Sequence, residues 1–121
     1  MAAVELTKEN FESEVAASDI AVIDFWAPWC GPCKAFAPTF EAVSEEHDGI
    51  LFGKVNTEEQ QELGAHFNIR SIPTLMVIRE NIVLFSQPGA LPKSALEGII
   101  EQTKAIDMQQ VHEEIAKQQA T

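Results

Sequence analysis

The sequence predicts an α/β protein in which a central mixed sheet carries helices on both faces. Two observations support this fold class: strand-like and helix-like patterns alternate through the first half of the chain, and a hairpin followed by a helix completes the second half. The length of 121 residues, of which 45% are hydrophobic, fits one globular domain.

The first elements are a helix, a strand and a second helix. Residues 11–17 are expected to form a helix with Thr7 as its N-cap. Residues 20–26 are a nearly unbroken apolar run, which is typical of a strand covered on both faces. From Cys33 onward apolar residues recur at helical spacing, and this pattern predicts an amphipathic helix with Pro38 as a kink inside it.

A strand and a short helix follow. Residues 50–56 resemble a second buried strand, and residues 57–67 a short helix. Gln60 stands three residues after Thr57, which indicates a capping box at the start of that helix.

The next elements are a hairpin and a last domain helix. Residues 74–78 and 82–85 are two apolar runs separated by three residues, which predicts a β-hairpin. Glu80-Asn81 at the turn leaves the turn type open. Pro92 is expected to open the helix that follows, because proline suits the first turn of a helix.

The apolar pattern changes phase near the C-terminus. Ile99 and Ile106 are seven residues apart and share one helical face. A second stripe, on the opposite side, is formed by Met108, Val111 and Ile115. One straight helix cannot bury both stripes on one core, so we expect a break near Asp107, which would cap a new helix.

Composition and charge exclude several classes of function. The formal net charge is −11, which repels phosphate backbones and anionic membrane surfaces, so neither nucleic acid nor a membrane is an expected partner. No apolar stretch approaches the roughly 18 residues of a membrane span. The N-terminus has no basic region followed by an apolar one, so a secretory signal is not expected.

Cys30 and Cys33, the chain's two cysteines, lie where the first predicted strand passes into a helix. Two cysteines at i and i+3 around a helix start can reach disulfide geometry. The first would lie among free N–H groups at the positive end of the helix dipole, which favours the nucleophilic thiolate. Pro32 between them fits a first turn, so the pair is expected to be held rigidly and to serve redox chemistry.

Three other roles for the cysteines are open. A zinc site needs four ligands, and the chain has no second cysteine pair. The histidines, expected to be solvated, are scattered at His47, His66 and His112. Inert core thiols would not need flanking tryptophan, glycine and proline, and a static bridge across so short a loop would add little stability.

Asp24 interrupts the apolar run of residues 20–26. A buried carboxylate is costly unless it has a partner or a task, so Asp24 is a candidate functional residue. The alternative is an acid at a strand end that reaches solvent. Lys54 on the neighbouring predicted strand is a candidate charge partner, and its alternative is a solvated lysine.

Several motifs together resemble the thioredoxin family. They are the stretch Asp24-Phe25-Trp26-Ala27-Pro28-Trp29-Cys30-Gly31-Pro32-Cys33-Lys34, then Pro38, Lys54-Val55-Asn56, Arg70-Ser71-Ile72-Pro73-Thr74 and Gly89-Ala90. The resemblance runs from residue 4 to about 104. It implies a thioredoxin fold with a mixed five-stranded sheet in a domain of residues 1–104, and residues 105–121 are expected to be a C-terminal helical extension.

The resemblance also implies roles for single residues. Cys30 would be the attacking nucleophile and Cys33 the resolving cysteine of a redox disulfide, with Asp24 as proton acceptor and Lys54 as the charge partner of Asp24. The Ile72–Pro73 bond would be cis and form a backbone platform for substrates. The expected docking surface comprises Trp29, Gly31, Pro32, Ile72, Pro73 and Gly89. Two departures from the family pattern, Thr57 and Pro88, affect substrate preference.

The implied activity is that of a cytoplasmic, monomeric protein-disulfide reductase with no bound cofactor. Its expected partners are disulfide-bearing proteins and a thioredoxin reductase that supplies electrons. One alternative is a disulfide oxidase or isomerase in an oxidising compartment, and another is a binding subunit without turnover. The Gly31-Pro32 dipeptide favours the reductase, because in this superfamily it accompanies reducing members.

Overall fold

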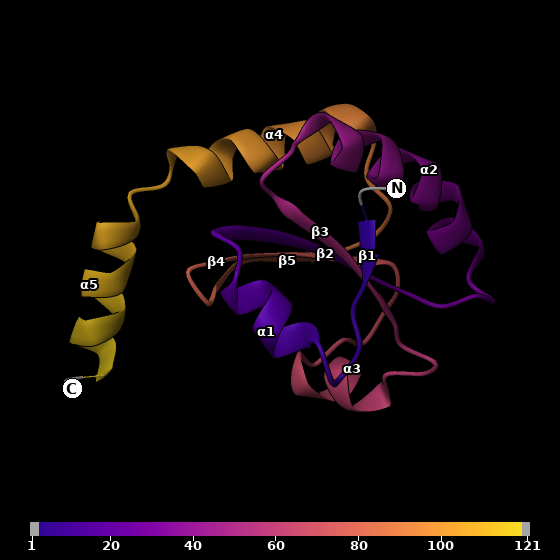
Figure 1. Ribbon diagram of the computed structural model, residues 1–121, viewed down its shortest axis with the longest axis horizontal. Helices are drawn as coiled ribbons and strands as arrows, with labels where there is room; N and C mark the ends of the chain where they lie inside the picture. The colour runs from indigo at the N-terminus through magenta and orange to yellow at the C-terminus, as the bar shows by residue number, and fades with distance from the viewer. Residues whose placement is uncertain (1–2, 120–121) are drawn as a thin grey trace.

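A computed structural model describes residues 3–119 as a five-stranded sheet between two layers of helices (Figure 1). The strands are β1 (Ala3–Glu5), β2 (Ile20–Trp26), β3 (Leu51–Asn56), β4 (Thr74–Arg79) and β5 (Ile82–Pro88). The helices are α1 (Phe11–Ala16), α2 (Gly31–Glu46), α3 (Gln61–His66), α4 (Lys93–Ala105) and α5 (Met108–Gln119). The predicted α/β architecture with a mixed sheet and a separate C-terminal helix is confirmed.

The sheet has the order β1-β3-β2-β4-β5. β1, β3 and β2 are parallel, whereas β4 runs antiparallel to β2, and β5 antiparallel to β4. The long apolar strand β2 therefore lies at the centre, and its carboxyl end carries the loop that leads into α2. This is the end of the sheet where the two cysteines lie.

Alternating side chains of the central strand build two cores, one on each face of the sheet. Ile20 and Val22 point to the face covered by α2 and α4, where they pack with Phe40 and Leu96. The intervening Ala21, Ile23 and Phe25 pack on the opposite face, which α1 and α3 cover (Figure 1). Both faces of β2 are thus buried, as its unbroken apolar run predicts.

One predicted N-cap and one predicted helix start are wrong. Asn10, rather than Thr7, is the N-cap of α1; the Thr7 carbonyl accepts a hydrogen bond from the Phe11 N–H (2.9 Å) in the turn before the helix. Helix α3 begins only at Gln61, so Thr57 caps nothing: its hydroxyl donates to the carbonyl oxygen of Trp26 (3.0 Å). In the second case a tertiary hydrogen bond takes the hydroxyl that the capping box would use.

The hairpin forms where its pattern predicts it. Glu80 and Asn81 at its turn both have positive φ, of 54° and 64°, as in the two-residue turns whose twist matches that of the flanking strands. Asparagine adopts this conformation more readily than most residues, which explains how the turn closes without a glycine.

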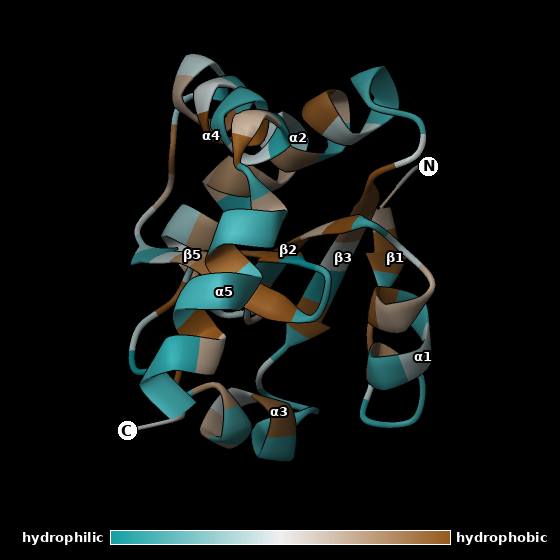
Figure 2. Cartoon of the chain, turned by 90° about the vertical axis from the view of Figure 1, so that its left-hand side faces the viewer, coloured by the Kyte–Doolittle hydropathy of each residue, from teal (hydrophilic) through white to brown (hydrophobic). Residues whose placement is uncertain are grey.

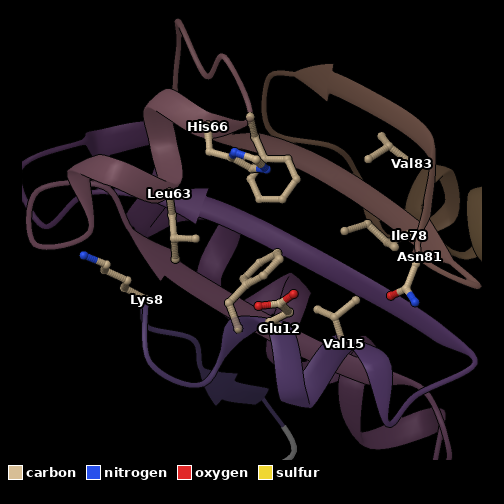
Figure 3. A pocket seen from close by; sticks show the side chains of 10 residues that line it. Lys8, Glu12, Val15, Leu63, His66, Ile78, Asn81 and Val83 are labelled. Atoms are coloured by element: carbon tan, nitrogen blue, oxygen red, sulfur yellow. The ribbon is translucent and has the colours of Figure 1, made fainter.

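A groove of about 380 Å³, lined by both apolar and polar side chains, lies between α1, α3 and the β4–β5 hairpin (Figure 3). Figure 3 shows Leu63 and His66 of α3 across the groove from Glu12 and Val15 of α1. Val83, which is exposed, forms part of its β5 side. The groove contains none of the residues predicted for the redox site.

Helix α5 follows α4 after the predicted break. The Asp107 carboxylate accepts a hydrogen bond from the Gln110 N–H (3.2 Å) and so caps the new helix. Met108 is buried, and His112 contacts Glu80 of the hairpin (Nε2 to Oε1, 2.7 Å). Helix α5 stands beside the domain in Figure 1, and in Figure 2, where it faces the viewer, its surface is mostly hydrophilic. No helix within residues 3–119 is long and apolar enough to cross a membrane.

Candidate active site

The two cysteines lie at the N-terminus of α2. Cys30 is the N-cap residue, and its Sγ accepts a hydrogen bond from the Cys33 N–H (3.2 Å). The two residues are joined as a disulfide, and both are buried, with Cys30 5% and Cys33 2% exposed. Pro32 lies in the first turn, where its missing N–H costs no hydrogen bond. A sulfur held by backbone N–H at a helix start is well placed to carry negative charge.

The segment before β4 lies against the disulfide. The carbonyl oxygen of Ile72 is 3.8 Å from Cys30 Sγ, and the Ile72–Pro73 peptide bond is cis. Gly89, with φ +108°, donates its N–H to the Pro73 carbonyl oxygen (2.8 Å). This conformation is one that L side chains rarely adopt, so a glycine suits the position. Three segments that are distant in sequence thus meet beside the redox sulfurs.

Trp29 stands at the surface next to Cys30. Its side chain is 68% exposed, and its indole N–H donates to Glu58 Oε2 (2.7 Å). Beside it lies a cleft of about 400 Å³. The cleft is lined by Trp29, Thr57, Gln61, Gly64, Ala65, Ile69, Arg70, Ser71 and Ile72. An exposed tryptophan above a partly apolar cleft is a surface suited to a polypeptide partner.

Asp24 is buried in β2 with 1% of its surface exposed, which excludes the solvated alternative. Neither of its carboxylate oxygens has a hydrogen-bond partner among the described residues. Burial raises the pKa of Asp24 from 3.8 to about 7, because desolvation penalises the charged form more than the charge of Lys54 favours it. Lys54 is the residue of β3 that pairs with Asp24 in the strand register.

Three comparisons with known proteins agree on the family. The thioredoxin family model matches residues 2–102 of the chain. The chain belongs to the thioredoxin family. A solved mutant thioredoxin from Halobacterium salinarum NRC-1 superposes with a TM-score of 0.79 at 25% identity, and the match covers 87% of this chain and 93% of that one.

Two relatives show how far the similarity extends. The thioredoxin of Haemophilus influenzae is 44% identical over 101 residues, which cover 82% of this chain and 94% of the relative. A Streptomyces coelicolor protein assigned as thioredoxin 2 is 52% identical over 117 residues, which cover 97% of this chain and 87% of the relative. The second match therefore also takes in most of residues 105–121.

The activity follows from the family together with the cysteine pair. The protein is a thioredoxin-type protein-disulfide reductase, a thiol–disulfide oxidoreductase that works through a redox-active pair of cysteines. Its partners in general are a reductase and proteins that carry disulfides.

One group of side chains has the spacing of a metal site. Ligand atoms of Glu46, His47 and Glu97 lie within 4.8 Å of one another. These groups already have partners: His47 Nε2 lies 2.9 Å from Glu97 Oε1, and Lys93 Nζ lies 3.0 Å from Glu46 Oε1. His47 is therefore half-buried rather than a solvated surface histidine as expected, whereas His66 and His112 are exposed.

The structure brings most of the residues selected from the sequence to one place. Ile72 packs against the cysteine pair and shares a cleft with Trp29, while Pro73 and Gly89 are hydrogen-bonded neighbours. Asp24 is buried in the central strand β2, two residues before the carboxyl end of that strand. Sequence reasoning missed Glu58, because an acidic residue in a strongly acidic chain gives no signal of its contact with Trp29.

Proposed function

We propose that Cys30 is the nucleophile and Cys33 the resolving cysteine of the disulfide-reduction reaction. The Cys30 thiolate attacks one sulfur of a substrate disulfide, forms a mixed disulfide and releases the other substrate sulfur as a thiolate. Cys33 then loses its proton and attacks Cys30 Sγ, which releases the second substrate thiolate. Two electrons pass to the substrate, and the Cys30–Cys33 disulfide of the structure is the oxidised product.

The observation that carries this assignment is the hydrogen bond from the Cys33 N–H to Cys30 Sγ at the start of α2. A backbone donor and the helix dipole both stabilise negative charge on Cys30. Cys33, one turn further in and less exposed, is less accessible to a protein substrate. It is accessible to Cys30, with which it forms the bridge.

Asp24 is the proposed proton acceptor for Cys33. A general base works best when its pKa lies near the operating pH, and burial brings the pKa of Asp24 to about 7. Its carboxylate oxygens are free of other hydrogen bonds among the described residues, so they are available to take a proton. Lys54 is its charge partner, since its positive charge opposes part of the rise in the pKa of Asp24.

The proposed docking surface surrounds Cys30. It comprises Trp29, Gly31, Pro32, Ile72, Pro73 and Gly89. The cleft between Trp29 and Ile72 gives it an apolar depression, and Arg70 supplies a positive charge at its border. Thr57 also lines this cleft, so its departure from the family pattern acts on substrate preference.

The proposed setting is a reducing compartment, the cytoplasm, with a thioredoxin reductase as electron donor. The Gly31-Pro32 dipeptide supports this setting, and the dithiol needs no bound cofactor for the exchange itself. We take residues 1–104 as the catalytic domain and residues 105–121 as the extension, acting as a monomer. A measured reduction potential well above that of reducing members of the family would instead favour an oxidase or isomerase.

Single-cysteine variants test the assignment. Cys33→Ser should abolish turnover and accumulate a mixed disulfide between Cys30 and a disulfide substrate such as insulin, detectable by non-reducing electrophoresis and mass spectrometry. Cys30→Ser is the matched control, and we expect it to be inactive without trapping substrate. Trapping by Cys30→Ser alone would reverse the two roles.

A further inference from the structure

A cleft of about 530 Å³ opens on the α2 side of the sheet, and it shares no lining residue with the cleft beside Trp29. One wall is a single face of α2, at positions three and four residues apart: Lys34, Ala37, Pro38 and Glu41. The other wall comes from β1, β2 and β3 and comprises Ala3, Glu5, Trp26 and Lys54. The cleft therefore joins the helix that carries the cysteines to the strand that carries Lys54.

Two polar atoms on this cleft are buried without a hydrogen-bond partner among residues 3–119, Glu41 Oε1 and Trp26 Nε1. Buried polar atoms are costly to leave unpaired, so each such atom calls for an explanation. Lys54 makes no ion pair within the described part of the chain. Its ammonium instead lies over the Trp26 ring, 4.6 Å from the ring centre.

Asp24 lies next to this ammonium. Val22 points into the core beneath α2, so Asp24, two residues further along β2, points to the same face. Lys54 occupies the matching position on β3. Lys54 thus acts electrostatically on the buried Asp24, and it lines the same cleft as Glu41 of the facing wall.

We propose that Glu41 is a positioning residue for the proton-transfer step, which competes with Asp24 for the Lys54 ammonium and so keeps Asp24 free of an ion pair. This inference rests on the proposed role of Asp24 as proton acceptor. When Asp24 takes the Cys33 proton, its carboxylate becomes a neutral acid and no longer attracts Lys54, whose charge Glu41 then balances. When Asp24 releases the proton to solvent, Glu41 still competes for Lys54, so the Asp24 carboxylate is again free to take a proton.

The other charged groups on the cleft do not replace Glu41. Glu5 of β1 is exposed, whereas Glu41 Oε1 is buried and needs a positive partner. Lys34 is a second, exposed ammonium on the same face of α2 as Glu41. On the other side β4 places the apolar Leu75 opposite Asp24, and Cys33 is the titratable group of α2 buried at this end of the sheet.

The experiment is a site-resolved titration of the Asp24 carboxyl carbon by NMR in the Glu41→Gln protein. Removing the competing carboxylate lets Lys54 pair with Asp24, which favours the ionised form, so the pKa of Asp24 should fall by about one unit. Glu41→Asp keeps the charge and should retain most of the original pKa. The matched control is Glu45→Gln, the same charge change at an exposed position of α2 that does not line the cleft, and it should leave the pKa unchanged.

The same Glu41→Gln change in a protein that lacks Lys54 tests whether Glu41 acts on Asp24 through Lys54. A Lys54→Met protein lacks the ammonium for which Glu41 and Asp24 compete. In that protein Glu41→Gln should shift the pKa of Asp24 by less than half as much as it does with Lys54 present. An unchanged Asp24 pKa in Glu41→Gln, an equal shift in Glu45→Gln, or a full shift without Lys54 would each overturn the inference.

The pH profile of disulfide reduction separates the inference from the proposed function. If both are right, the profile of Glu41→Gln moves to lower pH together with the pKa of Asp24. A pKa that falls while the rate profile stays in place supports the role of Glu41 and refutes Asp24 as the proton acceptor.

Discussion

The disulfide end of the sheet and helix α5 differ in the burial and pairing of their polar groups. At the disulfide end, both carboxylate oxygens of Asp24, the Trp26 indole nitrogen and one oxygen of Glu41 are buried without partners among the described residues. In α5, Met108 is the buried residue, and the polar contact that the helix makes with the hairpin, between His112 and Glu80, is exposed. Burying an unpaired polar group costs free energy, whereas an exposed pair contributes little.

This difference separates the part of the chain that performs chemistry from the part that adds stability. A fold keeps a destabilising buried carboxylate only where other interactions offset it, and such groups concentrate at functional sites. Nothing comparable occurs in α5, so we expect a change at Asp24 to alter both activity and stability, and removal of α5 to alter stability alone.

The largest effect is expected at Asp24. Its folded-state pKa of about 7 lies above the unfolded value of 3.8, so the ionised carboxylate destabilises the folded state. The loss of stability begins as pH rises above about 4 and is complete above about 7, where it amounts to at most about 4 kcal/mol. Asp24→Asn should remove this loss, raising the free energy of unfolding near pH 8 while slowing disulfide reduction near neutral pH.

Urea titrations and insulin-reduction assays at pH 4 to 8 measure both effects. The stability gain of Asp24→Asn should become small as pH falls to 4, because Asp24 is then neutral in the folded state and only about half ionised in the unfolded chain. Asp48→Asn makes the same change at an exposed position and should alter neither stability nor rate appreciably. A gain that does not depend on pH would contradict the raised pKa.

The next effect is expected on removal of α5. A chain ending at Asp107 loses the burial of Met108, worth roughly 1.5–3 kcal/mol before the entropy of ordering the helix is subtracted, and should be modestly less stable at unchanged reductase rate. A chain ending at Lys104 also loses the Ile106 carbonyl, an acceptor of the Arg79 guanidinium (3.4 Å), and should be slightly less stable again.

Melting midpoints and reduction rates of the full chain and both truncated chains test this expectation. The comparison of the two truncations distinguishes α5 itself from the end of α4. A large loss of activity in a truncated protein that still unfolds cooperatively would show that α5 takes part in partner recognition.

The parts of the fold that the sequence predicts are those with strong local patterns. β2 is found because seven successive residues are mostly apolar, and the break at Asp107 because two apolar stripes face opposite ways. β1 leaves no such pattern: it has three residues, two of them exposed, and is a strand only because it pairs with β3. Thr57 has the chemistry of a cap, but a contact across the structure with Trp26 takes its hydroxyl.

The candidate site, like the fold, is predictable only where single residues stand out in the sequence pattern. Asp24 stands out because it is a charge within an apolar strand, and the cysteines because of their spacing. Glu41 and Glu58 give no such signal, since both belong to a chain with nineteen acidic residues and only the tertiary structure shows that one is partly buried and the other holds Trp29. Residues that act by contact with distant segments are the ones that sequence patterns miss.

The smallest expected effect lies in α4, the helix that joins the two regions. Gly98 is exposed within it, and an added Cβ would meet no atom within 4 Å, so Gly98→Ala should stabilise the protein by up to about 1 kcal/mol through helix propensity. The matched control is Gly49→Ala: the space there is also open, but φ is +92°, so alanine is strained and should destabilise.

If α5 is held only by its own contacts, the stability gain from Gly98→Ala should be the same within about 0.5 kcal/mol in the full chain and in the chain ending at Asp107. Urea unfolding of the full chain and of the chain ending at Asp107, each with and without Gly98→Ala, measures this additivity. A gain that disappears with α5 would mean that α4 and α5 stabilise each other, and the separation of the two regions would be wrong.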